Sequence, residues 1–82
     1  MPYLSHTITE QRLLPVALFT GNNGVEGHNL FTVRYRFTQD MAGGDFVELL
    51  RLTRNNKNIL KKLDSGIVER IEDFLLNSME GK

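Results

Sequence analysis

The chain has 82 residues, and ten Lys and Arg side chains balance ten Asp and Glu side chains, so its formal charge is zero. There is no Cys and no Trp, which excludes a disulfide framework and any cysteine-containing zinc site. The length favours a single small domain over residues 1–82, and small domains without disulfides often gain stability by associating with themselves or with a partner.

The first part of the chain is predicted to form strands and turns. Residues 3–9 mix apolar and hydroxyl side chains as a short edge strand would. The run from Leu13 to Thr20 is almost continuously apolar, and its length favours a buried strand. Pro15 has no N–H to donate, so we expect an edge position or a bulge there. The Gly- and Asn-rich residues 21–29 predict a loop.

The clearest secondary-structure signal lies in residues 31–38. Apolar and polar side chains alternate there with the period of two that is typical of a strand with one buried face. One face would carry Phe31, Val33, Tyr35 and Phe37, and the other Thr32, Arg34, Arg36 and Thr38. With the preceding apolar run, this strand would form an antiparallel hairpin at about residues 13–38.

After residues 41–44 the apolar spacing changes, and we expect helices. Residues 46–53 fit a helix with Asp45 as its N-cap and Glu48 near the capping-box position, with a strand as the rival interpretation. Asn55-Asn56 interrupts the pattern, and Asn58 would cap a second, short helix that bears Ile59, Leu60 and Leu63. Residues 67–77 show the spacing of an amphipathic helix.

The sequence therefore predicts an α+β domain with a β-rich half at residues 1–40 and a helical half at residues 44–79. A small antiparallel sheet of two or three strands would be covered on one face by two or three C-terminal helices. Aromatic side chains of the sheet and of the helices would meet in the core between them: Phe31, Tyr35, Phe37, Phe46 and Phe74.

The zero net charge divides into a basic and an acidic block. Five bases and no acid lie between Arg51 and Lys62, whereas five acids and one base lie between Asp64 and Glu80. The ordinary explanation is a solvated charged face on each helix, with ion pairs between neighbouring helices as a possible addition. The other is a phosphate-contacting surface that also includes the basic strand face. The candidate binding residues are Arg34, Arg36, Arg51, Arg54, Lys57, Lys61 and Lys62.

A basic strand followed by two helices is the element order of ribbon–helix–helix DNA-binding proteins. The extra break at Asn55-Asn56 does not fit that arrangement, so no family is assigned from the sequence.

No pattern in the sequence predicts an active site. The two histidines, His6 and His28, have no neighbouring nucleophile and no metal-ligand spacing. The glycines of residues 21–27 lead into a strand, whereas a phosphate-binding loop leads into a helix. We therefore expect no enzyme, no cofactor and no metal.

The composition and the charge layout together predict a non-enzymatic protein-binding module. It would act as a homodimer or as an accessory or inhibitory subunit of a larger assembly. The alternative is a small nucleic-acid-binding regulator that uses the basic strand face and the basic helix segment. No apolar run is long enough to cross a membrane, so a cytoplasmic location is expected.

Overall fold

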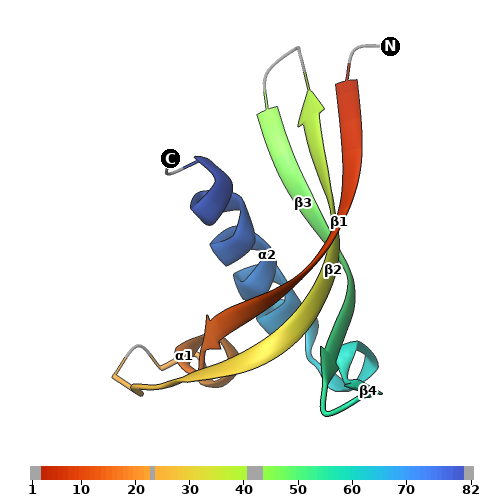
Figure 1. Ribbon diagram of the computed structural model, residues 1–82. Coiled ribbons are helices and arrows are strands. Elements are labelled where there is room, and N and C mark those ends of the chain that lie inside the picture. The colour runs from red at the N-terminus through yellow and green to blue at the C-terminus, as the bar shows by residue number, and fades with distance from the viewer. Residues whose placement is uncertain (1–2, 23, 41–43, 81–82) are drawn as a thin grey trace.

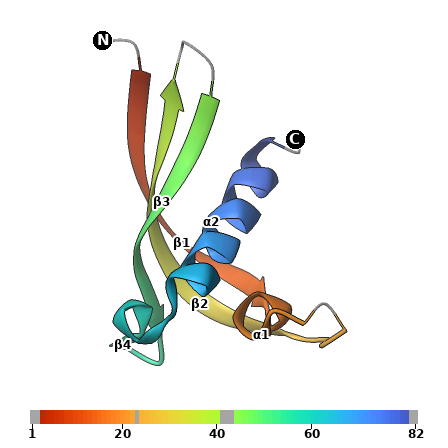
Figure 2. The same cartoon turned by 180° about the vertical axis from the view of Figure 1, so that it is seen from behind.

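The computed structural model describes residues 3–22, 24–40 and 44–80, with only the backbone described for residues 3, 4 and 80. The described chain forms a four-stranded antiparallel sheet in the order β1-β2-β3-β4, and one long helix, α2, runs along one face of this sheet (Figures 1 and 2). The broad α+β class is thus confirmed. The elements are β1 (Tyr3–Pro15), α1 (Ala17–Thr20), β2 (His28–Asp40), β3 (Gly44–Arg54), β4 (Lys57–Asn58), the 3-10 turn η1 (Leu60–Lys62) and α2 (Ser65–Glu80).

The first hairpin is longer than predicted and begins earlier. β1 pairs with β2 from Tyr3 opposite Asp40 to Pro15 opposite His28. The predicted strand from Leu13 to Thr20 is wrong beyond Pro15, because the chain turns there into α1. That turn lets Phe19 stack on Phe31, with 5.2 Å between the ring centroids.

The expectation of a helix at residues 46–53 is wrong, and the rival strand interpretation is right. β3 buries Val47, Leu49 and Leu52 against α2. The pairing register of β2 with β3 shifts at a bulge that leaves Leu50 without an opposite residue. Because a bulge interrupts the period of two, the buried positions change from odd to even numbers and imitate helical spacing. Asp45 is therefore a strand residue and caps no helix.

Among the described residues after β3 there is one long helix, α2. Asn55 and Asn56 have φ values of 53° and 64°, the left-handed conformation that a tight turn requires and that Asn tolerates. They lead into β4, and the short helix predicted after Asn58 is a single 3-10 turn, η1. The Asn58 side-chain oxygen accepts the Leu60 N–H at 3.1 Å where η1 begins. The predicted amphipathic helix is confirmed as α2 and extends a few residues further at each end.

The core lies between the sheet and α2. The alternation predicted for residues 31–38 is confirmed on its apolar side, because Phe31, Val33, Tyr35 and Phe37 are buried. Ile71 and Leu75 of α2 are fully buried against them. Phe46 was expected in this core, but it is 55% exposed. Within the described residues, no helix has the length and apolarity to cross a bilayer.

Candidate binding face

The sheet has one face covered by α2 and one face that no described element covers. We call the uncovered side the outer face. Its members follow from the pairing register of β1, β2 and β3, because directly opposite residues point to the same side of a sheet. They are Ser5, Thr7, Thr9, Gln11, Leu13, Pro15, His28, Leu30, Thr32, Arg34, Arg36, Thr38, Asp40, Gly44, Phe46, Glu48, Arg51 and Thr53.

A shallow hollow lies near the middle of the outer face. Its volume is about 210 Å³, and five side chains from three adjacent strands line it: Thr9, Thr32, Arg34, Arg51 and Thr53. The register places Thr9, Arg34 and Arg51 in one row across the sheet, and Thr32 lies opposite Thr53. Guanidinium groups and hydroxyl groups are hydrogen-bond donors, so all five side chains that line the hollow can donate to a bound ligand.

The charges of the outer face are only partly balanced. Arg36 forms an ion pair with Glu48 across β2 and β3, with a nitrogen–oxygen distance of 3.4 Å. Arg34 and Arg51 face each other directly, and neither forms an ion pair with any acid in the described part of the chain. Like charges at directly opposite positions of a sheet repel each other. The hollow is therefore a positively charged position that a bound anion would neutralise.

The seven basic residues predicted for binding divide into two groups. Arg34, Arg36 and Arg51 share the outer face. Arg54 does not, because its guanidinium lies over the Phe31 ring on the side of α2, 5.7 Å from the ring centroid. Lys57 is its opposite residue in β4.

The two remaining lysines, Lys61 and Lys62, lie in η1, outside the sheet. The basic block thus does not form one surface, but Arg51 joins the basic strand face. The helix predicted for residues 46–53 hid this position of Arg51, because Arg51 reaches the strand face only through the pairing of β2 with β3.

The acidic block does not neutralise the basic block. In the described part of the chain, the ion pairs join Arg12 to Glu10 and Arg36 to Glu48, and none joins α2 to residues 51–62. α2 lies on the covered side of the sheet (Figures 1 and 2), so the sheet separates its acids from the outer face. Glu72 instead accepts a hydrogen bond from the Leu49 N–H at 2.7 Å.

No protein-family model, curated protein or solved structure matches this chain significantly.

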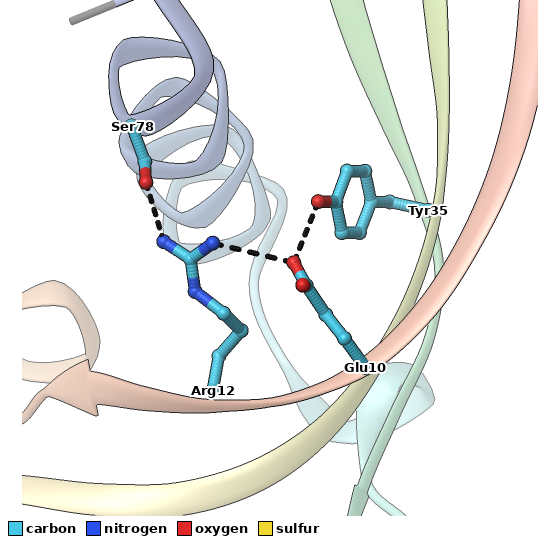
Figure 3. Close-up of polar contacts among 4 residues, drawn as sticks. All are labelled: Glu10, Arg12, Tyr35 and Ser78. Atoms are coloured by element: carbon cyan, nitrogen blue, oxygen red, sulfur yellow. Dashed lines mark hydrogen bonds and ion pairs between the residues drawn. The ribbon is translucent and has the colours of Figure 1, made fainter. Parts of the chain in front are cut away.

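A polar network crosses the core side of the sheet (Figure 3). The Tyr35 hydroxyl donates to Glu10 at 2.7 Å, and Arg12 contacts Glu10 at 3.2 Å. The other end of the Arg12 guanidinium donates to Ser78 of α2 at 2.6 Å. The network therefore connects β1, β2 and α2.

Burial, followed by the hydrogen bond to Glu10, raises the pKa of Tyr35 to about 12. A phenol with this pKa keeps its proton at neutral pH and acts as a hydrogen-bond donor, so we assign the network to holding α2 on the sheet. Sequence reasoning missed Glu10 and Arg12. The signal was their spacing of two from Leu14, which places them on the covered face once β1 is known to reach Pro15.

The histidines and carboxylates that could serve in catalysis or metal binding do not gather at one place. His6 and His28 are both exposed, in β1 and at the first residue of β2. Within the described ranges, no three His, Asp or Glu side chains come close enough to hold a metal ion together.

Proposed function

We propose that this protein is a non-enzymatic, cytoplasmic binding protein that binds nucleic acid through the outer face of its sheet. The observation that carries the proposal is the directly opposed pair of Arg34 and Arg51, which forms no ion pair with any acid of the described chain and stands in a hollow lined by three threonines. A phosphate group in that hollow would accept hydrogen bonds from both guanidinium groups and remove their mutual repulsion.

Two further features support a polyanionic ligand. Arg36 lies on the same strand face two residues from Arg34, so a second phosphate could be contacted along β2. The helix α2, which carries four of the five acids of the acidic block, lies on the far side of the sheet (Figures 1 and 2), so the sheet separates these acids from a polyanion bound to the outer face. Arginine and hydroxyl contacts to phosphate fix a protein on nucleic acid without selecting a sequence, so binding with little sequence preference is expected.

The exposed apolar side chains of the outer face favour a second candidate, a protein-binding module. Leu13 and Leu30 are directly opposite each other and are 60% and 52% exposed, and Phe46 is 55% exposed. Apolar side chains surrounded by polar ones are typical of protein interfaces. An acidic protein partner would use the same arginines, and the chain would then act as an accessory or inhibitory subunit.

Fluorescence anisotropy separates the two candidates. Labelled double-stranded DNA, single-stranded DNA and single-stranded RNA are titrated with the protein at low salt, and each titration is repeated as salt is raised. The nucleic-acid proposal predicts binding whose logarithm falls linearly with the logarithm of salt concentration. An absence of binding to all three at low salt would exclude it. Binding only to an acidic polypeptide such as poly-glutamate would instead support the protein-binding candidate.

A further inference from the structure

The two edges of the sheet differ in what covers them. At the β3 edge, β4 pairs with Thr53 and Arg54, and the Glu72 carboxylate of α2 binds the Leu49 N–H. β1 forms the other edge and pairs only with β2. It is 13 residues long, and an edge of that length presents a row of unpaired backbone groups on which another strand can pair.

Alternate residues of an antiparallel edge strand direct their backbone N–H and C=O groups toward the neighbouring strand, and the residues between them direct theirs outward. One hydrogen bond of β1 shows which residues belong to each set. The Val16 N–H donates to the Gly27 oxygen at 3.0 Å, and this pair continues the register of Pro15 opposite His28. In an antiparallel ladder, every second pair exchanges hydrogen bonds. The even-numbered residues of β1 therefore bond to β2, and the open edge carries the N–H and C=O groups of Ser5, Thr7, Thr9, Gln11 and Leu13.

Pro15 belongs to the same outward-facing set. Proline has no N–H, and within sheets it is tolerated where that missing donor would point to solvent. Its odd number agrees with this, because the odd-numbered residues of β1 face away from β2. It also ends the usable part of the edge, because a strand that added beyond residue 13 would meet no donor at residue 15.

We propose that a second copy of this chain adds its β1 antiparallel to this edge, about a two-fold axis at Thr7. This register pairs Thr7 with Thr7 of the partner subunit and Ser5 with Thr9 of the partner subunit. Opposed hydroxyl side chains stabilise an antiparallel pair. Residues 5–9 carry no acid, Lys or Arg, and in this register no charged side chain of one copy comes opposite a charged side chain of the other. Glu10 and Arg12 point to the covered side and are already paired with each other.

This assembly goes beyond the proposed function and rests on a different observation. The two sheets would join into one continuous sheet with both α2 helices on the same side, because a two-fold axis perpendicular to a sheet keeps its faces. The two outer faces would then form one surface that carries Arg34, Arg36 and Arg51 twice. A 9.4 kDa chain with a small core would also gain stability from the added pairing.

Cross-linking through one introduced cysteine tests the register. The chain has no cysteine of its own. Opposite residues of a hydrogen-bonded antiparallel pair have Cα atoms about 5.5 Å apart, within the range of about 4.4–6.8 Å that a disulfide spans. Under mild oxidation, Thr7→Cys should therefore form a covalent dimer on non-reducing gels much faster than the control Thr53→Cys, which lies on the outer face away from the edge. Equal cross-linking of the two variants would overturn the proposal.

Sedimentation equilibrium of the unmodified protein supplies the second readout. A dimer that dissociates on dilution is expected, and Thr7→Lys should shift it to monomer because two like charges would meet at the axis. Asn77→Lys, which adds the same charge at an exposed position of α2, should leave the dimer intact. A monomer at every concentration would overturn the proposal, and so would a dimer that both substitutions leave unchanged. Because nucleic acid is absent from both assays, neither outcome depends on the proposed function.

Discussion

Arg34 and Arg51 occupy directly opposite positions of β2 and β3, and within the described chain no acidic side chain forms an ion pair with either. This arrangement is unfavourable for the free protein, because like charges opposed in a sheet destabilise it. A bound phosphate reverses the effect, since both guanidinium groups then donate to one anion. Stability and binding should therefore respond in opposite directions when one of these arginines is removed.

We predict that Arg51→Gln leaves the protein as stable as before or slightly more stable. Relief of the repulsion should contribute roughly 0.2–1 kcal/mol at low salt. Urea unfolding in low-salt buffer measures the change. Arg36→Gln is the control, because it loses the ion pair with Glu48 and has no repulsion to relieve. A loss of stability for Arg51→Gln beyond that of Arg36→Gln would contradict the account.

Glu48→Gln should strengthen nucleic-acid binding. Glu48 lies on the outer face, where it holds Arg36 in an ion pair. Its neutralisation removes one negative charge from the binding face and frees a guanidinium for phosphate, which should raise affinity roughly two- to five-fold at low salt. Anisotropy titrations measure the change. The control is Asp73→Gln, at an exposed position of α2. An equal gain of affinity in that variant would indicate a general charge effect and not a contact at the outer face.

Glu72→Ala should destabilise the protein, whereas Glu69→Ala on the same helix should not. Glu72 accepts the Leu49 N–H at 2.7 Å and so joins α2 to the edge of β3, while Glu69 is exposed. Loss of a hydrogen bond to a charged, partly buried acceptor costs about 1–2 kcal/mol. The difference between the two urea midpoints gives this value, and equal midpoints would show that the contact does not hold α2.

The raised pKa of Tyr35 predicts a loss of stability in alkaline solution. The folded protein holds the phenolic proton up to about pH 12, whereas the unfolded chain releases it near 10. The contribution is complete below pH 10 and disappears as the pH rises through 12, with a total of about 3 kcal/mol. Urea unfolding at increasing pH measures it. Tyr35→Phe should lack this part of the pH dependence, and a parallel decline in both proteins would contradict the pKa.

The same Tyr35→Phe substitution measures the hydrogen bond to Glu10 at neutral pH. It removes only the hydroxyl, so the packing of the ring is retained and a cost of about 1 kcal/mol is expected. Ultraviolet titration supplies an independent readout of the pKa. With Tyr3→Phe as background, Tyr35 is the one tyrosine left, and its absorbance change should be centred near pH 12. A midpoint near 10 would show that the phenol is not buried as described.

Sequence patterns predicted the parts of this fold that follow a simple period. The alternation over residues 31–38 and the helical spacing over residues 67–77 were both visible and correct. The strand β3 could not be predicted in this way, because the bulge at Leu50 changes which residues face the core. No Gly or other typical bulge residue near Leu50 marks this bulge in the sequence. The predicted helix placed Phe46 in the core. In the strand β3, Val47 and Leu49 face the core, so Phe46 points to the outer face.

The candidate site was partly visible for a related reason. Arg34 and Arg36 belong to the regular strand, so their common face could be inferred from the alternation alone. Arg51 reached that face only through the pairing of β2 with β3, which is a long-range contact. Arg54 follows Thr53 and so points to the covered side of β3, and the turn at Asn55 and Asn56 places Lys57 opposite it in β4. Charge counts along a sequence do not contain this information.

The most direct test of the central claim is the salt dependence of DNA binding by the double variant Arg34→Ala with Arg51→Ala. If both guanidinium groups contact the same phosphate, the slope of log K against log salt should become less steep by about 0.9, the contribution of one neutralised phosphate. The matched variant Lys57→Ala with Lys61→Ala loses the same charge outside the outer face and should keep the slope of the unmodified protein. An unchanged slope in the arginine variant, or an equal decrease in both variants, would contradict the assignment of the outer face as the nucleic-acid-binding surface.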